Sequence, residues 1–252
     1  FRPTNGPQIK DFIFAMPFDR EKQQGMTYAR FWTHRSAQKG LYEVDFPNSV
    51  AGTFRCLPEF YDKFNLPGDK RNEQYLTGKM FKRKNYEATT VPFTINTSKK
   101  GIDQDYTGSD ADVKFDWQVE LTKEIVLRPD GAETLNCGND QKGRSMGYRS
   151  IKFYADLETT KAQNRSQSND VPIFRYADIL LMKAEAILRG ATATNGDTPA
   201  SLMNQIRAYV SAPSVTGTPT LDELLDERAR EFANESWRRN DLIRFGKFEE
   251  PW

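Results

Sequence analysis

The segment from Asp170 to Gly190 constrains the fold most, because it carries the strongest helical pattern in the chain. Pro172 suits the first turn of a helix, and Asn169 or Asp170 can cap that turn. Gly190 can end the helix, since glycine readily adopts the left-handed conformation. Its apolar residues fall on two adjacent stripes, Ile173, Tyr176, Leu180, Ala184 and Ile187 on one and Ala177, Leu181 and Leu188 on the other. A helix that is apolar on two sides must pack between neighbours, so we expect helices against both.

Two further helices are predicted after this segment. Thr198 and Pro199 mark the start of one that runs to about Val210, and Thr220 with Glu223 forms a capping box that starts the next. The expected apolar positions are Leu202, Ile206, Tyr209 and Val210 in the first helix and Leu221, Leu224, Leu225, Phe232 and Trp237 in the second. This succession of helices and turns is typical of tetratricopeptide-like hairpins.

Three motifs in this part of the chain occur together in a known family. They are Phe174-Arg175-Tyr176-Ala177-Asp178-Ile179-Leu180-Leu181-Met182 with Ala184-Glu185-Ala186, then Asn204-Gln205-Ile206-Arg207, then Glu227-Arg228, Glu231-Phe232, Glu235, Arg238 and Asp241 to Phe248. In this order and spacing they resemble the RagB/SusD family of outer-membrane nutrient-binding lipoproteins of Bacteroidetes. The resemblance is firm from Gly147 onward and looser before it.

The resemblance and the helical pattern together predict a mainly α, SusD-like fold in two parts. Residues 171–248 would form the tetratricopeptide-like helical part, and residues 1–170 a loop-rich mixed α+β subdomain on the ligand side. Within residues 1–170 we expect strands near residues 8–16, 91–95, 119–127 and 148–154, a helix over 57–64, and a loop over 130–147. Because proteins of this family are longer, the chain is expected to be a C-terminal portion truncated at both ends.

The resemblance also implies a function. Such a protein binds a nutrient glycan, starch-like or another polysaccharide or oligosaccharide, and delivers it to a SusC-like TonB-dependent transporter without catalysis. It would be held at the cell surface of the outer membrane by a lipid anchor outside this chain. Consistent with this, no apolar run approaches the ~20 residues that a membrane-spanning helix needs.

The composition excludes several other classes of protein. The formal net charge of +1 argues against a nucleic-acid-binding protein. His34 is the single histidine, so a zinc site built on histidines is excluded, and no phosphate-binding glycine motif is present. Three alternatives stay open: a peptide-binding uptake lipoprotein of the same family, a glycoside hydrolase with two facing carboxylates, and a plain tetratricopeptide scaffold.

Aromatic side chains are the candidate ligand-binding residues, because their faces cover the apolar faces of sugar rings. The candidates lie in polar surroundings rich in glycine or proline, and are Trp32, Tyr42, Phe46, Tyr75, Tyr106 and Trp117. Trp237 lies on a helical stripe and is assigned to the core.

Acidic residues and cysteines offer two further candidates. Asp103 and Asp105 fit the first half of a calcium-binding loop, although Lys114 occupies the position of the bidentate glutamate. Calcium is thus a candidate ligand and no cofactor is required. Cys56 and Cys137 could form a disulfide or remain as two small core residues. The glutamates and arginines between Glu227 and Arg244 are interpreted as structural ion pairs.

Overall fold

The computed structural model describes residues 1–3, 9–22, 25–46, 49–128, 135–159 and 166–250. The chain divides into two compact units: Phe1–Thr4, Phe18–Pro58 and Tyr75–Asn169 form the first, and Asn5–Pro17, Glu59–Gln74 and Asp170–Trp252 the second. Helices make up 30% of the chain and strands 19%, so the chain contains more strand than the expected mainly α fold implies. Among the described residues, no helix is both long and apolar enough to cross a membrane.

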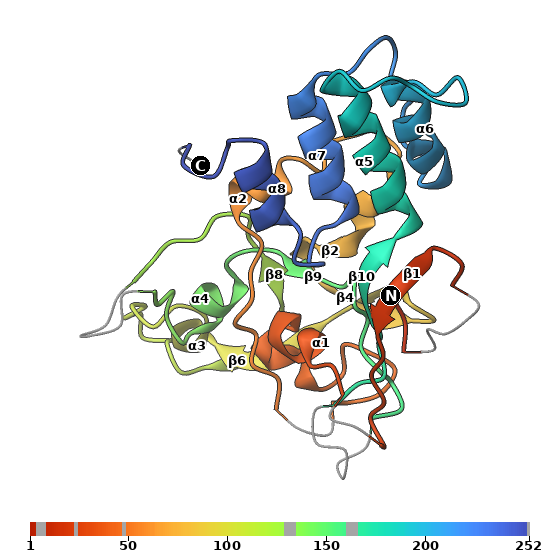
Figure 1. The fold of residues 1–252 in the computed structure, drawn as a ribbon. Helices are drawn as coiled ribbons and strands as arrows, with labels where there is room; N and C mark the ends of the chain where they lie inside the picture. The colour runs from red at the N-terminus through yellow and green to blue at the C-terminus, as the bar shows by residue number, and fades with distance from the viewer. Residues whose placement is uncertain (4–8, 23–24, 47–48, 129–134, 160–165, 251–252) are drawn as a thin grey trace. The chain divides into compact units, whose positions relative to one another are not determined.

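The second unit contains the longer helices. They are α5 (Tyr176–Leu188), α6 (Pro199–Tyr209), α7 (Leu221–Glu231) and α8 (Arg238–Arg244) (Figure 1). Both predicted helix starts after α5 are confirmed, because Thr198 caps α6 through Ser201 and Thr220 caps α7 through Glu223. The buried core of this unit includes Leu180, Leu181, Ala184, Leu202, Met203, Ile206, Leu224 and Phe232. Trp237 packs against this core as expected.

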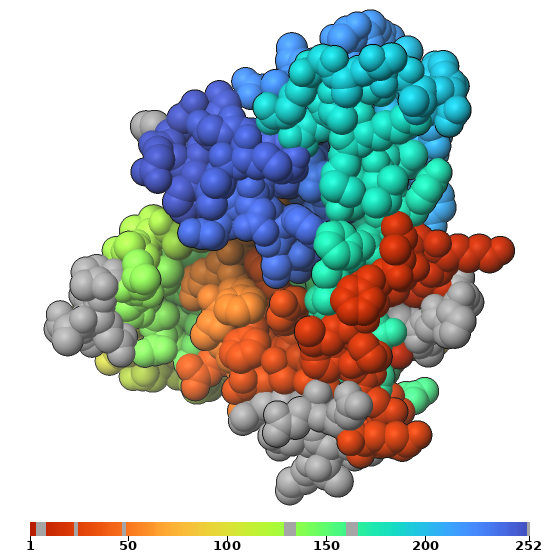
Figure 2. Space-filling model, in the orientation of Figure 1, coloured from red at the N-terminus to blue at the C-terminus, as the bar shows by residue number. Residues whose placement is uncertain are grey.

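The start of α5 differs from the prediction. Residues Val171–Arg175 form strand β10, which pairs with the antiparallel strand β1 (Phe12–Met16), and the helix begins at Tyr176. Figures 1 and 2 show β1 in red against the teal segment that leads into α5. The backbone oxygen of Asp11 accepts a hydrogen bond from Tyr176 N (2.7 Å), and its carboxylate accepts one from Ala177 N (3.3 Å). Asp11 therefore caps this helix in place of the predicted local residues.

Some positions expected in the helical core are exposed. Tyr176 and Tyr209 are 54% and 88% exposed, because they stand at the first and last positions of their helices. Trp237 was predicted on the same helix as Leu221, but α7 ends at Glu231. Asn234 and Ser236 follow with left-handed φ values of 63° and 67°, so the backbone turns before α8 begins.

The first unit consists of short strands and one-turn helices. Its strands are β2 (Tyr75–Leu76), β3 (Gly78–Lys79), β4 (Phe81–Lys84), β5 (Glu87–Pro92), β6 (Thr94–Ser98), β7 (Lys114–Gln118), β8 (Glu120–Leu121) and β9 (Arg149–Ser150). They pair in antiparallel two-stranded ribbons, β2 with β9, β3 with β8, β4 with β5 and β6 with β7. Its helices are α1 (Tyr28–Trp32), α3 (Lys99–Ile102) and α4 (Gln141–Ser145). The buried core includes Leu41, Tyr42, Met80, Phe93, Val119, Leu121 and Tyr154.

The predicted short elements are confirmed only in part. The strand expected over 8–16 is observed as Phe12–Met16, and residue 8 lies outside the described residues. The helix expected over 57–64 shrinks to α2 (Pro58–Tyr61), and the strand expected over 148–154 shrinks to β9. Ile125 and Leu127 lie outside any strand. In the loop expected over 130–147, residues 130–134 lie outside the described residues, as does Trp252, and Gln141–Ser145 form the helix α4 instead, capped by Asp140.

Candidate functional site

Four of the six aromatic candidates belong to the core of the first unit. Tyr42 and Tyr75 are 7% and 5% exposed, so the core encloses these two rings and leaves them no face for a ligand. Burial raises the pKa of Tyr42 to about 12. Phe46 packs edge-on against Tyr42, with ring centroids 5.7 Å apart, and Trp117 is partly buried against the same core. Tyr42 and Tyr75 therefore do not form a ligand surface, whereas Phe46 and Trp117 keep part of their surface exposed and stay candidates.

Tyr106 is held within a polar cluster. Its hydroxyl donates a hydrogen bond to Asp110 Oδ1 (2.7 Å), and Lys99 Nζ lies 2.5 Å from Asp110 Oδ2. The same ammonium lies 5.3 Å from the centre of the Tyr106 ring. One side of this half-buried ring is thus covered by a cation, which leaves less of it for a sugar.

Trp32 is half-buried, and it is the candidate that the structure joins to two further rings, of which Phe54 is exposed. Phe31 and Phe54 stack with their centroids 5.1 Å apart and their planes 25° apart. Trp32 meets Phe54 edge-on at 5.7 Å, and Phe54 is 43% exposed. We call Phe31, Trp32 and Phe54 the aromatic cluster. Sequence reasoning missed Phe31 and Phe54, because nothing in the sequence pairs the helix at Phe31 with a loop 23 residues later.

The backbone fixes the positions of these rings. Helix α1 carries Phe31 and Trp32, and Phe54 N donates to Phe31 O (3.0 Å). Gly52 has a φ of +62°, and a Cβ there would lie 2.9 Å from Arg35 N, so only glycine allows the two segments to approach this closely. The Arg30 guanidinium lies 4.9 Å from the centre of the Phe31 ring and donates through Nε to Ser49 O (3.2 Å). With Arg30 and Phe54 against it, Phe31 supports the cluster, and Trp32 and Phe54 are the rings left for a sugar. The aromatic cluster is therefore built on two segments joined by hydrogen bonds.

The chemistry of this arrangement suits a polar ring with apolar faces. Aromatic side chains bury large areas while losing little conformational entropy, and nearby guanidinium groups donate hydrogen bonds to hydroxyl or carboxylate oxygens. A sugar has both kinds of surface.

His34 does not have the environment of a catalytic base. It is 1% exposed, its Nδ1 accepts a hydrogen bond from Ser36 N (3.2 Å), and its Nε2 lies 3.3 Å from Ser145 Oγ. The first contact places the proton on Nε2, so the ring donates to the serine. Burial, together with Arg149, Arg144 and Arg55, lowers the pKa of His34 to about 3. The histidine is neutral and acts as a fixed hydrogen-bonding group.

The two aspartates proposed for calcium lie beside cations. Asp103 pairs with Lys142 at 2.8 Å, and Asp105 lies 3.9 Å from Arg128. Within the described part of the chain, no group of three or more acidic, histidine or cysteine side chains is positioned to hold a metal ion. Calcium binding by Asp103 and Asp105 stays a prediction, and an ion there would have to displace Lys142.

Both cysteines are buried thiols. Cys56 and Cys137 are free in this structure. Burial raises the pKa of Cys56 to about 12, so this thiol is held in its unreactive, protonated form. The structure therefore agrees with the second of the two interpretations, small core residues.

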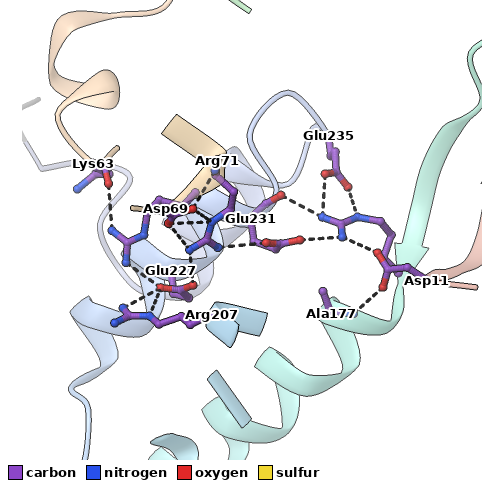
Figure 3. A network of polar contacts seen from close by, with 11 residues as sticks. Asp11, Lys63, Asp69, Arg71, Ala177, Arg207, Glu227, Glu231 and Glu235 are labelled. Carbon is purple, nitrogen blue, oxygen red and sulfur yellow. Dashed lines mark hydrogen bonds and ion pairs between the residues drawn. The ribbon is translucent and has the colours of Figure 1, made fainter. Parts of the chain in front are cut away.

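The second unit contains a buried network of ion pairs (Figure 3). Glu227 is fully buried and lies within 2.9 Å of three arginines, Arg71, Arg207 and Arg230. Burial would raise the pKa of Glu227, but the three arginines more than offset this and hold it below its usual value. Arg175 contacts Asp11, Glu231 and Glu235. The structural interpretation of these residues is confirmed, because they join separate segments of one unit.

Arg228 extends this pattern to the last helix. It pairs with Asp178 of α5 at 2.8 Å and with Asp241 of α8 at 3.0 Å. Asp241 also pairs with Arg244, which contacts Glu185 of α5. Ion pairs therefore link helices α5, α7 and α8 to one another.

Comparison with known proteins places this arrangement in a family. A model described as the SusD family matches residues 10–252, which is nearly the whole chain. The chain belongs to the SusD family. This SusD-family chain is 43% identical over 172 residues to the starch-binding protein SusD of Bacteroides thetaiotaomicron, a match that covers 63% of this chain and 30% of that protein.

Solved structures of SusD-like proteins share the fold. The surface glycan-binding protein A of Bacteroides thetaiotaomicron superposes with a TM-score of 0.55 at 18% identity, covering 94% of this SusD-family chain and 43% of that one. A laminarin-binding SusD-like protein superposes with a TM-score of 0.53 at 20% identity, covering 95% and 43%. The chain therefore spans less than half the length of these relatives, and at this identity the likeness shows the fold alone.

Proposed function

We propose that this SusD-family chain belongs to a cell-surface protein that binds a nutrient glycan without catalysing a reaction. The observation that carries the proposal is the 43% identity to a starch-binding protein. The aromatic cluster supports it, since a stacked, partly exposed group of rings is the surface on which a sugar binds. The neutral, buried His34 and the ion-paired, buried Glu227 are not placed to act as a general base or acid.

We also infer the setting from the family. The protein would be lipid-anchored at the outer membrane and would deliver its glycan to a SusC-like TonB-dependent transporter. Helices α5 to α8 would form the tetratricopeptide-like part, which the packing of α5 against α6 and α7 supports. Loss of sugar uptake on deletion of the gene, with the transporter still present, would test this setting.

Calorimetric titration with a panel of oligosaccharides tests the binding function, using Trp32→Ala and Phe54→Ala as variants. Each variant should weaken binding about tenfold, because the lost stacking, about 0.5–1.5 kcal/mol, adds to the loss of the apolar area that the ring buries. Tyr209→Ala is the matched control, since Tyr209 is an exposed ring far along the chain in the other unit. Trp117→Ala tests another of the aromatic side chains that the sequence offers for glycan binding. This variant should lower the stability of the protein rather than remove binding.

The outcomes separate the alternatives. Binding that survives both cluster variants would place the site elsewhere in the protein. No binding to any oligosaccharide, together with binding to peptides, would replace the proposed function with peptide uptake.

A further inference from the structure

One group of arginines in the first unit has no counter-charge. Six arginines are buried among the described residues, and five of them, Arg71, Arg175, Arg207, Arg228 and Arg230, pair with carboxylates. Arg149 is the exception. It is 1% exposed, it makes no ion pair among the described residues, and its Nε is buried without a hydrogen-bond partner. A buried charge without a counter-charge is costly, and Arg149 is too buried to touch a ligand, so its charge adds to the positive potential at the more exposed arginines beside it.

Backbone carbonyls give Arg149 partial compensation. Its Nη1 donates to Phe54 O (3.3 Å), Met146 O (3.2 Å) and Gly147 O (3.0 Å), and its Nη2 donates to Arg144 O (2.6 Å). These dipoles hold the guanidinium in place but carry no net negative charge. The Arg149 side chain is therefore fixed and remains electrostatically uncompensated.

Other arginines gather around Arg149. Arg55 donates through Nη1 to Gly143 O (2.8 Å) and to Met146 O (3.0 Å), so Arg55 and Arg149 share one carbonyl acceptor. Arg144 is half-buried, and its Nε is also buried without a partner. Arg35 is exposed, and the hydrogen bond from Ser36 Oγ to Gln141 Oε1 (2.8 Å) holds its segment against α4, the helix that carries Arg144. We call these four residues the arginine group: Arg35, Arg55, Arg144 and Arg149.

No carboxylate in the described part of the chain pairs with the arginine group. The nearest candidate by sequence is Asp140, whose carboxylate is already bound to Arg128 (2.6 Å), Gln104 N (2.9 Å) and Gly143 N (2.8 Å). His34, which lies among these arginines, is neutral. The group thus concentrates four positive charges, with Asp140 as a partial counter-charge to Arg144, and three of the four side chains, those of Arg35, Arg55 and Arg144, reach solvent.

The arginine group adjoins the aromatic cluster. Arg55 follows Phe54 in the chain, and the carbonyl of Phe54 accepts the hydrogen bond from Arg149. We propose that the arginine group binds the carboxylate of an acidic sugar, a uronic acid, whose ring lies on the aromatic cluster. This proposal rests on the glycan-binding function proposed above and narrows its substrate to an anionic glycan. Planar guanidinium groups suit a carboxylate, because they donate two parallel hydrogen bonds.

The test compares an oligogalacturonide with the same oligosaccharide after methyl esterification, by calorimetric titration of the whole chain. Esterification removes the charge and keeps the rings and linkages. The acid should bind at least tenfold more tightly than the ester, since a charge-assisted hydrogen bond is worth about 1.5–3 kcal/mol. Raising the salt from about 50 mM to about 500 mM should reduce this preference.

Arg35→Gln and Arg144→Gln are the variants, because both side chains reach solvent and their loss does not empty the core. Each should reduce the preference for the acid about tenfold while leaving binding of the ester unchanged. Arg239→Gln is the matched control, since it removes an exposed arginine without an ion pair in the other unit. Comparable loss in the control would show a general charge effect and overturn the proposal.

Other outcomes distinguish this proposal from the proposed function. Equal binding of the acid and the ester would overturn the acidic-sugar proposal and leave glycan binding intact. Binding of maltohexaose, without binding of either the acid or the ester, would do the same. Binding of sodium sulfate alone as tight as that of the oligogalacturonide would show that the arginine group holds an inorganic anion, which also overturns it. Failure of every oligosaccharide, neutral or acidic, would overturn both.

Discussion

His34 shows how much a single residue depends on neighbours that the sequence does not reveal. From the sequence, His34 served only to exclude a zinc site built on histidines, because it is the single histidine. The structure buries it among Arg149, Arg144 and Arg55, and burial is the main cause of its low pKa. His34 is therefore neutral in the folded protein at pH values at which it is protonated in the unfolded chain.

This difference predicts a pH dependence of stability. The pKa of His34 falls from 6.5 in the unfolded chain to about 3 in the folded protein. Its contribution to stability is therefore complete above about pH 6.5 and is lost as the pH falls toward 3. Between about pH 6.5 and pH 5 the free energy of unfolding should decrease by roughly 1 kcal/mol per pH unit. Urea unfolding at a series of pH values measures this slope.

His34→Gln is the control for that slope, because glutamine can still donate a hydrogen bond to Ser145 and does not titrate. The variant should unfold with a free energy that is nearly constant over the same range. A wild-type protein whose stability did not change between about pH 6.5 and pH 5 would contradict the buried, neutral histidine.

Helices that begin with a local signal could be predicted, and those that begin with a distant one could not. Thr198 and Thr220 cap α6 and α7 through residues three positions later, so the sequence alone reveals these starts. The start of α5 depends on Asp11, which lies 166 residues from Ala177. The aromatic cluster also depends on contacts between separate segments. Trp32 could be predicted from its residue type, whereas Phe54 contacts Trp32 only in the folded chain.

Removing the cap of α7 tests the value of its local signal. Thr220→Ala deletes the hydroxyl that accepts from Glu223 N (3.1 Å) and should lower the free energy of unfolding by about 1 kcal/mol. Thr218→Ala is the control, because Thr218 is exposed and lies just before the helix. Urea unfolding followed by far-ultraviolet circular dichroism compares the two. Equal stability of both variants would show that the capping box contributes nothing.

At the scale of the whole molecule, buried charge is a main organising feature of the second unit. Glu227 of α7 holds Arg207 of α6 and Arg71 of the segment Glu59–Gln74, while Arg175 reaches Asp11 (Figure 3). Segments from three regions of the sequence meet in this network. The motifs that identified the family in the sequence are in large part the residues of these ion pairs, which explains why they predicted the fold better than the ligand.

Neutralising the centre of the network should be strongly destabilising. Glu227→Gln leaves three arginines with less counter-charge in a buried site, and we expect a loss of about 3–5 kcal/mol in the free energy of unfolding. Glu59→Gln is the matched control in the same unit, where an exposed glutamate should change stability by less than about 0.5 kcal/mol. Chemical denaturation of both variants is the measurement, and a loss below about 1 kcal/mol for Glu227→Gln would show that the carbonyls and solvent already balance the arginines.

The pairing of β1 with β10 has a consequence for how the protein is made. Phe12 lies opposite Arg175, so more than 160 residues must leave the ribosome before this ribbon can close. The partners of Arg175 on α7 emerge later still. Contacts so distant in sequence form slowly, because closing a long loop costs entropy before any contact repays it. During synthesis, the earliest strand of the second unit therefore waits with its backbone hydrogen-bonding groups unpaired, and an unpaired strand edge of this kind is prone to pair with other chains.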